Sequence, residues 1–322
     1  MARNATRRTG PVAALLALGV LTATLTGALT GVAPTGAEAA TQAPDTAYMA
    51  WRGTGNDPRI YWSRLVNGRW TLQQGFPAST AREPDLAYLN GRAYMVWRGY
   101  GADNHIWWSR YDGQRWSSPR QLADRRTTYA PAVGVVNGKL LMAWRGAQPD
   151  NHIWWSTFNG TSWSAQRVLD DRRAVGAPAL GSANGRLVMA WRGAGTDDRI
   201  WWSTFNGTSW SGQRVLDDRR TAAWPTLGTH GRTLVMAWRG TGPDDHIWWS
   251  TFNGTSWSPQ MVLADRRTAN YPALGSGAGR LYMAWRGAGT DDHIWWSSYN
   301  GSSWSGQRGL ADRRTSGSPG MS

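Results

Sequence analysis

Pairs of adjacent aromatic residues recur along the chain, as in Trp201-Trp202, with Tyr61-Trp62 as the first pair. An indole face can pack against the apolar C–H face of a sugar ring. We expect the first member of each pair to have this role, and the second, which alternates with Ile, to pack between structural units. The candidate first members are Trp107, Trp154, Trp201, Trp248 and Trp295.

A loop rich in carboxylate, amide and imidazole groups precedes each pair, as in Asp103-Asn104-His105. Such groups donate and accept hydrogen bonds together, which suits neighbouring hydroxyl groups of a sugar. The alternative role is loop scaffolding by Asx turns, which we expect of the first Asp. The candidate binding residues of these loops are Asn104, Asn151, Asp198, Asp245, Asp292, His105, His152, His246 and His293.

A third recurring group is Asp-Arg-Arg, as in Asp218-Arg219-Arg220. We expect one Arg to pair with an Asp of the same or the next unit, and the other to offer its guanidinium donors to a ligand. The first copy has Ser79 to Arg82 instead, so we expect four to six sites, with the first the least competent. The candidate binding residues of this group are Arg126, Arg173, Arg220, Arg267 and Arg314.

These groups belong to a repeat, which is marked by a Trp-Arg-Gly sequence. Its successive spacings are 46, 47, 47, 47 and 47 residues. A period of this length indicates one supersecondary unit that is copied around a ring or along a solenoid. The Trp of this sequence falls at Trp51, Trp97, Trp144, Trp191, Trp238 and Trp285.

One repeat divides into four short runs, at residues 178–182, 186–192, 200–205 and 210–216. Asn-Gly pairs at 184–185 and 206–207 suit tight hairpin turns. Residues alternate along the runs, with aromatic side chains on both faces, so each unit must pack against a neighbour on both sides. The pattern predicts an all-β fold built from four-stranded antiparallel propeller blades.

The two ends of the chain predict how the ring closes. The first unit begins at its second strand, residues 46–53, and residues 318–322 match a first strand with nothing after it. We therefore expect the C-terminal strand to complete the N-terminal blade of a six-bladed propeller. Strand alternation also places the polar loops and the Asp-Arg-Arg segments at one rim, opposite the Asn-Gly turns.

The N-terminus is typical of an export signal. Arg3, Arg7 and Arg8 precede an apolar stretch, and Ala37-Glu38-Ala39 is a small-x-small cleavage signal. We expect residues 1–40 to be a signal peptide and residues 41–322 to form one propeller domain that is secreted. A membrane anchor is the lesser alternative, and nothing later in the sequence has the length and apolarity of a membrane span.

Composition narrows the classes of function. The formal net charge is +14, but many Arg residues stand beside Asp, whereas nucleic-acid binders cluster basic residues with few acids. Affinity for acidic polymers stays open. There is no Cys, no metal motif, no phosphate loop and no nucleophile elbow, and the loops have too few regularly spaced oxygens for calcium. We therefore expect neither a metal nor a cofactor.

The motif Arg-Gly-x-Gly-x-Asp-Asx-His-Ile-Trp-Trp, seen from Arg286 to Trp296, resembles the repeats of bacterial propeller lectins of the Photorhabdus fucose-binding type. The unit length is also similar to that of tachylectin-like propellers. This resemblance covers residues 46–322 and implies sugar pockets between neighbouring blades, although those relatives differ in blade number. The stretch from Ser203 to Trp210 resembles a sialidase Asp-box with Phe205 in place of its Asp, which supports the fold more than the reaction.

Near-identical copies favour binding over catalysis. Glycosidases generally need two carboxyl groups flanking the bond, and the mature chain has a single Glu, Glu83. Several weak sites on one rim would bind an arrayed ligand with high avidity. We expect a secreted lectin-like protein that recognises cell-surface or cell-wall glycans. The alternatives are a targeting or scaffold subunit that binds other secreted proteins in a toxin-like complex and, as an enzyme, a sialidase-like hydrolase.

Overall fold

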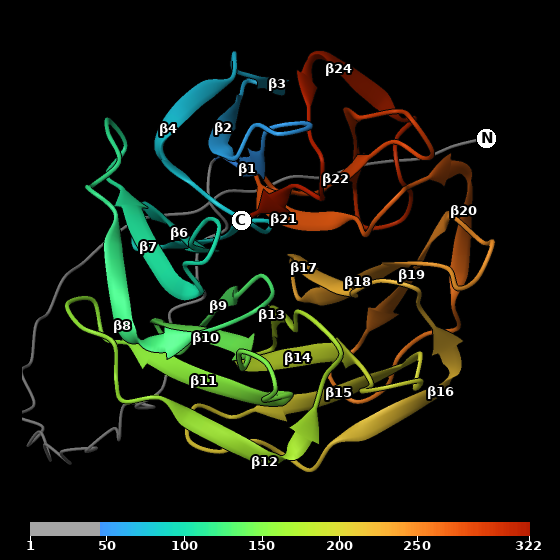
Figure 1. Ribbon diagram of the computed structural model, residues 1–322. Coiled ribbons are helices and arrows are strands. Elements are labelled where there is room, and N and C mark those ends of the chain that lie inside the picture. Colours follow the sequence, from blue (N-terminus) through green and yellow to red (C-terminus); the bar gives the residue numbers. More distant parts are fainter. Residues whose placement is uncertain (1–45) are drawn as a thin grey trace, which may run out of the picture. The chain divides into compact units, whose positions relative to one another are not determined.

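The computed structural model describes residues 46–322, which form six antiparallel sheets arranged as blades around a central axis (Figure 1). The regular elements of this part of the chain are all strands, and none of it is a helix that is long and apolar enough to cross a membrane. The predicted six-bladed propeller is confirmed. The predicted signal peptide, residues 1–40, lies outside the described residues.

Each blade has its first strand at the axis and its last strand at the perimeter. Blade 4 consists of β13 (Ala179–Ala183), β14 (Arg186–Arg192), β15 (Arg199–Phe205) and β16 (Arg214–Arg220), in that order. Four other blades follow the same order. They are β5 (Asp85–Leu89), β6 (Arg92–Arg98), β7 (His105–Tyr111), β8 (Arg120–Arg126); β9 (Ala132–Val136), β10 (Lys139–Arg145), β11 (His152–Phe158), β12 (Arg167–Arg173); β17 (Thr226–His230), β18 (Thr233–Arg239), β19 (His246–Phe252), β20 (Met261–Arg267); and β21 (Ala273–Gly277), β22 (Arg280–Arg286), β23 (His293–Tyr299), β24 (Arg308–Arg314).

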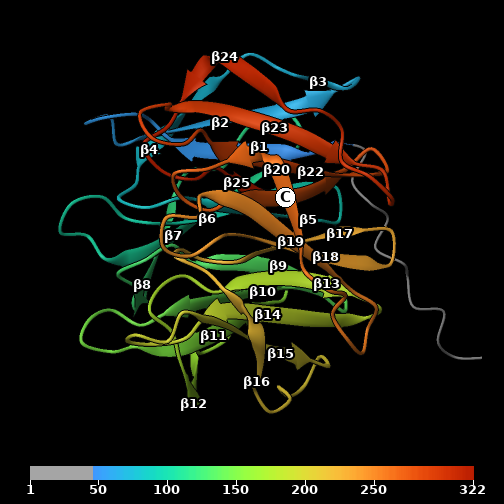
Figure 2. The same ribbon diagram turned by 90° about the vertical axis from the view of Figure 1, so that its right-hand side faces the viewer.

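Blade 1 joins the two ends of the described chain, as predicted. It contains β1 (Tyr48–Arg52), β2 (Arg59–Val66), β3 (Arg69–Trp70), β4 (Gln74–Ser79) and, as its innermost strand, β25 (Gly320–Met321). Met321 pairs with Met49 in antiparallel register and is only 3% exposed. The two views of the ribbon show β25 beside β1 near the axis (Figures 1 and 2). This strand closes the ring.

The Asn-Gly turns differ in their geometry. Asn184 and Gly185 have φ values of 49° and 72°, as a two-residue hairpin turn of positive φ requires. At the second turn only Gly207 has positive φ, and the Asn206 side chain accepts hydrogen bonds from the amides of Thr208 and Ser209. The second connection is therefore wider than the predicted tight hairpin, and it is held by an Asx turn.

The outer strand begins and ends later than predicted. We expected it at residues 210–216 and a loop at 217–221, but β16 extends to Arg220, and Trp210 forms only an isolated bridge with Phe205. Ile200 pairs with Leu216 and Arg199 with Arg220, so the outer strand bulges between these pairs. The bulge re-aims Arg219 into the space between blades, where it is 3% exposed while its neighbours face solvent.

The core consists of layers between blades. Trp191, Met189 and Leu187 of blade 4 pack against Ile153 and Trp155 of blade 3, and each of these five side chains is buried. The two members of an aromatic pair point to opposite faces, so Trp201 contacts the preceding blade and Trp202 the following one. This division is the one that strand alternation predicted.

Candidate functional site

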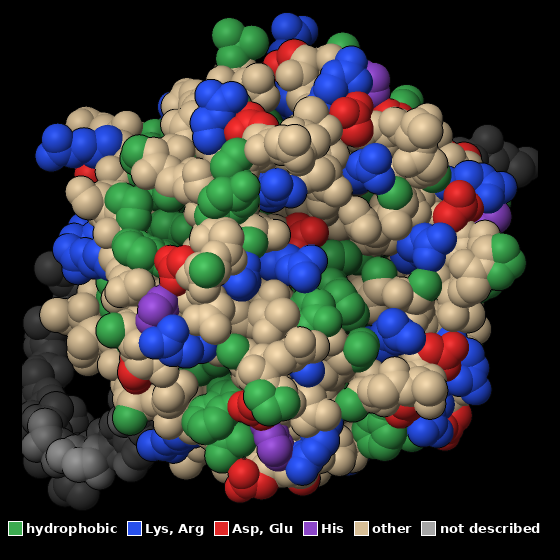
Figure 3. Space-filling model, viewed as in Figure 1, with side chains coloured by type: hydrophobic (Ala, Val, Ile, Leu, Met, Phe, Trp, Pro, Cys, Tyr) green, Lys and Arg blue, Asp and Glu red, His purple; other side chains and the backbone are tan. Residues whose placement is uncertain are grey.

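The polar loops and the ends of the outer strands lie on one face of the disc, which we call the loop face. Alternation of antiparallel strands puts the 193–198 loop and its equivalents at this end and the Asn-Gly turns at the other. The space-filling view shows groups of Asp, Arg and His side chains around the loop face, with further charged and apolar side chains at its centre (Figure 3). The predicted rim is therefore confirmed as an arrangement of elements.

The first Asp of each loop organises three hydrogen-bond donors. Asp150 Oδ1 accepts the backbone N–H of His152 at 2.9 Å and lies 2.7 Å from its Nδ1, while Oδ2 accepts the Trp154 indole N–H at 2.6 Å. Partial burial raises the pKa of Asp150, but these hydrogen bonds outweigh it and lower the pKa overall. The same set of contacts forms at Asp103, Asp244 and Asp291.

In two repeats an Arg takes the place of the His. Arg199 pairs with Asp197 at 2.9 Å and lies over the Trp201 ring, with its guanidinium carbon 5.7 Å from the ring centroid. In the first repeat, Arg59 makes the same contacts with Asp57 and Tyr61, and its hydrogen bond is the main reason that the pKa of Asp57 falls to about 2. Asp57 is thus the first Asp of the first loop.

The second Asx of the loop pairs with the second Arg of the outer strand. Arg220 donates to Asp198 at 2.7 Å, and equivalent bonds join Arg267 to Asp245, Arg314 to Asp292 and Arg126 to Asn104. Arg173 departs from this pattern, because it donates to the backbone carbonyl of Asp170 instead of to Asn151. The structure therefore brings the predicted residues together in one cluster per blade. Their role in binding a ligand stays a prediction.

The sixth repeat places three potential metal ligands together. Ligand atoms of Asp291, Asp292 and His293 lie within 4.8 Å of one another. Each group already has a partner in the chain, because Asp291 contacts His293 and Asp292 pairs with Arg314 at 2.7 Å. A metal ion would have to displace the guanidinium, so this cluster is first of all an ion-pair network.

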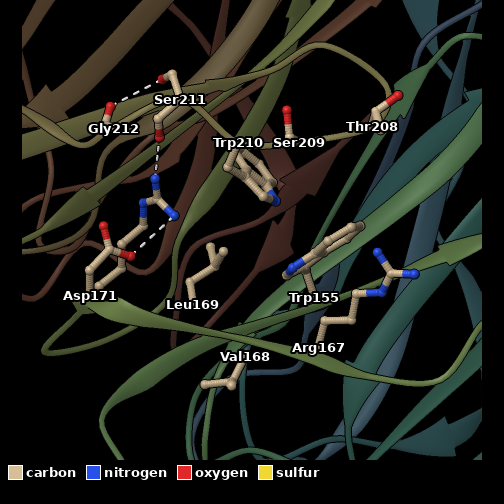
Figure 4. Close-up of a pocket in the computed structure, with 11 residues that line it drawn as sticks. Trp155, Arg167, Val168, Leu169, Asp171, Thr208, Ser209, Trp210, Ser211 and Gly212 are labelled. Carbon is tan, nitrogen blue, oxygen red and sulfur yellow. Dashed lines mark hydrogen bonds and ion pairs between the residues drawn. The ribbon is translucent and has the colours of Figure 1, made fainter.

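A cavity of about 440 Å³ lies elsewhere, at the perimeter between blades 3 and 4 (Figure 4). Strand β12 forms one wall, and the 206–213 hairpin of the next blade forms the other. We use the name inter-blade groove for this cavity and for the equivalent positions between the other neighbouring blades. The residues that line it are Trp155, Arg167, Val168, Leu169, Asp171, Arg172, Thr208, Ser209, Trp210, Ser211 and Gly212.

An exposed arginine stands on an indole face at the mouth of the groove. The guanidinium carbon of Arg167 lies 5.2 Å from the centroid of the Trp155 ring. Among the described residues, this guanidinium has no ion pair and no hydrogen-bond partner, so it is held only by the ring and its N–H donors stay available. The same stacking occurs for Arg120 on Trp108, Arg214 on Trp202 and Arg308 on Trp296.

A second arginine is buried at the inner end of the groove. Arg172 is 4% exposed, donates to the Ser211 carbonyl of the next blade and pairs with Asp171 at 3.4 Å. Burial lowers the pKa of Arg172, and the nearby Asp171 carboxylate counteracts this. The carboxylate itself is 59% exposed, so it offers acceptors to the groove. The equivalent buried residues are Arg125, Arg219, Arg266 and Arg313.

The hairpin Trp completes the groove. The Trp210 and Trp155 rings are nearly perpendicular, at 80° with centroids 6.3 Å apart, and Figure 4 shows the Trp210 indole nitrogen directed toward Trp155. All buried side-chain polar atoms without a hydrogen-bond partner in residues 46–322 are N–H donors of Trp or Arg, including Trp210 Nε1 and Arg172 Nε. The inter-blade space is therefore richer in donors than in acceptors.

The grooves are not all alike. Met261 replaces the stacked arginine between blades 5 and 6, although Arg266 is present there. Between blades 1 and 2, Gln74 occupies the stacked position and there is no buried arginine. Phe76 packs edge-on against the hairpin residue Trp116 in that groove, with ring centroids 5.6 Å apart. Four grooves thus carry both arginines, and the groove between blades 1 and 2 carries neither.

Arg167 and Trp210 of this groove are not among the residues predicted from the sequence, whereas Asp171 and Arg172 belong to the recurring Asp-Arg-Arg group. The second Trp of each pair is predicted to pack between units, which its burial of at least 92% supports. A signal was present, because Arg-x-Leu recurs three times at the start of an outer strand in addition to Arg167-Val168-Leu169. These other copies begin at Arg120, Arg214 and Arg308.

No protein-family model and no curated protein matches the chain. Among solved structures, a six-bladed propeller lectin from Aleuria aurantia, described as having a novel fucose recognition mode, is similar with a TM-score of 0.64 and 14% identity, covering 84% of this chain and 97% of its own. AofleA from Arthrobotrys oligospora has a TM-score of 0.60 and 11% identity, with 87% and 89% covered. YjhT has a TM-score of 0.55 and 12% identity, with 82% and 95% covered. Identity this low shows the fold alone.

Proposed function

We propose that this chain is a multivalent carbohydrate-binding protein whose sugar sites are the inter-blade grooves. The observation that carries the proposal is the free guanidinium of Arg167 stacked on Trp155, with the exposed carboxylate of Asp171 lining the same cavity. The overall fold is that of six-bladed lectins, which supports the same conclusion.

The chemistry of the groove suits a pyranose. Its hydroxyl groups donate and accept hydrogen bonds, so they can bond with Arg167 and with the Asp171 carboxylate together. Leu169, Val168 and the indole of Trp210 offer apolar surface to the C–H face of the ring. A volume of about 440 Å³ is in the range of small-molecule sites and has room for one sugar unit.

The differences between grooves predict the number of sites. We expect four grooves of similar affinity, a weaker one beside Met261 and none beside Phe76. The Aleuria lectin has been solved with α-methyl-L-fucoside and with Fucα1-6GlcNAc, so fucosides are the first ligands to test. If the predicted signal peptide is used, the targets are glycans of cell surfaces or cell walls.

A glycan array probed with the mature chain tests the function. The location is tested with a variant in which Arg120, Arg167, Arg214 and Arg308 become Met, the residue that the fifth groove already has. We expect roughly tenfold weaker binding per site, since hydrogen bonds to charged groups contribute about 1.5–3 kcal/mol. The matched control replaces by Met four exposed arginines at or just before the start of the second strand of a blade, which removes the same charge without changing the residues that line the cavity. These residues are Arg92, Arg186, Arg232 and Arg280.

A third variant addresses the predicted loop-face clusters, with His105, His152, His246 and His293 changed to Ala. If this variant loses binding while the groove variant keeps it, the sugars bind at the loop face and the groove assignment is wrong. If the array and direct titration with fucosides show no binding to the unaltered chain, carbohydrate binding itself is wrong.

A further inference from the structure

The repeats become unlike one another at the axis. A linker enters the innermost strand of each blade through a residue followed by Pro. These linkers begin on the loop face at the perimeter, where the outer strands end, and run inward to the innermost strand of the next blade. The residues before the six prolines are Glu83, Ala130, Ala177, Trp224, Tyr271 and Ser318. Five residue types at one position of a near-identical repeat indicate that this position does not serve the repeated sites.

Aromatic side chains from separate linkers meet there. The Trp224 ring lies 5.5 Å from Tyr129 and 6.4 Å from Tyr271, measured between centroids. It rests on Gly176, where an added Cβ would be 2.3 Å from the ring, so only glycine leaves room for it. All three aromatic residues remain partly exposed. Linkers into blades 3, 4, 5 and 6 therefore build one aromatic surface.

Two carboxyl groups adjoin this surface. The Ser318 hydroxyl accepts the backbone N–H of Tyr271 at 3.2 Å and donates to its carbonyl at 2.6 Å, so Tyr271 lies beside the 317–318 segment that Glu83 also approaches. Burial raises the pKa of the Tyr271 hydroxyl, and the carboxyl groups of Glu83 and Asp85 raise it further. Glu83 Oε1 lies over Gly317, where an added Cβ would be 2.3 Å away. Asp85 Oδ2 accepts the Val133 amide at 2.8 Å. We call Glu83, Asp85, Trp224 and Tyr271 the axial cluster.

The carboxyl groups of the axial cluster have no basic partner among the described residues, although 11 Arg–Asp ion pairs form elsewhere in that part of the chain. The nearby cations are engaged by other groups. Arg82 and Arg145 each lie 5.2 Å from the Tyr129 centroid and donate to backbone carbonyls. Burial raises the pKa of Asp85 to about 7, and Glu83 interacts with the Tyr271 hydroxyl. A chain of formal charge +14 thus keeps two carboxyl groups beside aromatic rings with no ion-pair partner among residues 46–322.

We propose that the axial cluster binds one primary ammonium group carried on a sugar ring, that is, an amino sugar. An ammonium has three donors and no acceptor, which matches a carboxylate. Partly exposed Trp and Tyr rings attract a cation and also pack against the C–H face of a pyranose. The site is single and does not depend on the inter-blade grooves.

Titration calorimetry with glucosamine at pH 6.5 tests this proposal, with glucose and N-acetylglucosamine as ligands that have a similar ring but no charge. We expect one glucosamine per chain, at least tenfold weaker binding of the two neutral sugars, and weaker binding of glucosamine at high salt. Glu83→Gln should weaken glucosamine binding about tenfold or more. The matched control is Asp170→Asn, which removes an exposed carboxylate that has no ion pair among residues 46–322.

A substitution of Glu83 by Ala should not prevent folding, because Ala130 and Ala177 occupy the same position in two other linkers. Glu83→Ala should therefore keep the melting temperature and lose the ligand. The variant with four groove arginines changed to Met should bind glucosamine normally, which separates this proposal from the proposed function. No glucosamine binding, equal affinity for glucose and glucosamine, or unchanged binding by Glu83→Gln would each overturn it.

Discussion

A single aspartate determines how much of the loop is free to bind a ligand. In the third repeat, Asp150 already takes the indole N–H of Trp154 and contacts the imidazole of His152. The polar edge of that Trp is therefore occupied, and only the remaining ring surface is available. The inter-blade groove differs, because the donors of Arg167 are held in place by stacking and have no partner among the described residues.

Asp85 predicts an unusual dependence of stability on pH. Burial raises its pKa from 3.8 to about 7, so the folded chain retains a proton that the unfolded chain releases above pH 4. This contribution to stability is complete below pH 3.8 and is lost as the pH rises through 7. Asp85→Asn should remove the effect and raise the free energy of unfolding at pH 8 by up to about 4 kcal/mol.

Denaturant unfolding at pH 5 and pH 8 checks this prediction. The gain from Asp85→Asn should be small at pH 5 and large at pH 8, while Asp170→Asn should show no such difference. An equal effect of Asp85→Asn at both pH values would mean that the carboxyl group is not buried in the way described.

At the scale of elements, the blades could be predicted from the sequence, whereas the bulge and the full length of each outer strand could not. The period, the alternation and the Asn-Gly turns predicted the blades because each is a local signal. Asp217-Asp218-Arg219-Arg220 has the polar composition of a loop, yet the chain continues as strand through it. The reason is tertiary, since the bulge buries Arg219 against the Ser258 carbonyl of the next blade.

The same limit applies to the candidate site. The sequence shows that Trp155, Arg167 and Trp210 recur, but strand alternation alone cannot tell which repeats meet. Trp155 and Arg167 pair across neighbouring strands of blade 3, whereas Trp210 comes from blade 4. The groove arises from the packing of one blade on the next. The loop-face cluster lies within a single blade, and for this reason its assembly could be anticipated.

Strand β25 predicts a large effect of a small deletion. Removing residues 320–322 leaves the inner edge of β1 unpaired, although β1 still pairs with β2, and takes the buried Met321 out of the core. Loss of one buried Met side chain alone costs about 2–5 kcal/mol, so the free energy of unfolding should fall by at least about 3 kcal/mol. Thermal unfolding measures the change, and a chain extended by three residues after Ser322 is the control.

A peptide of residues 315–322 should partly restore the truncated chain in a concentration-dependent way, because it binds the folded ring and not the unfolded chain. Unchanged stability of the truncated chain would show that closure of the ring does not depend on β25.

For the whole molecule, repetition of the groove predicts avidity. Equivalent sites around one disc can engage an arrayed ligand together, so apparent affinity for a densely fucosylated surface should exceed that for free fucoside by about 10²–10⁴. Dissociation rates measured at several ligand densities test this. The variant with four arginines changed to Met should lose most of this dependence on ligand density. A dissociation rate of the unaltered chain that does not change with ligand density would indicate a single site.

The two proposals assign different kinds of recognition to the perimeter and to the axis. Four grooves carry the same pair of arginines, whereas the residues before the six prolines differ from blade to blade and lie near the axis. A propeller can therefore combine multivalent attachment with a single selective site, without any additional domain.

The hydrogen bond between the Tyr48 amide and Ser322 joins residues 274 positions apart. During synthesis the first blade lacks its innermost strand, and the inner edge of β1 stays uncovered, until every other blade has been made. An uncovered strand edge can accept a strand from any chain. Two molecules that start folding side by side can therefore exchange their final strands, so a wide spacing of nascent chains favours closure of each ring by its own strand.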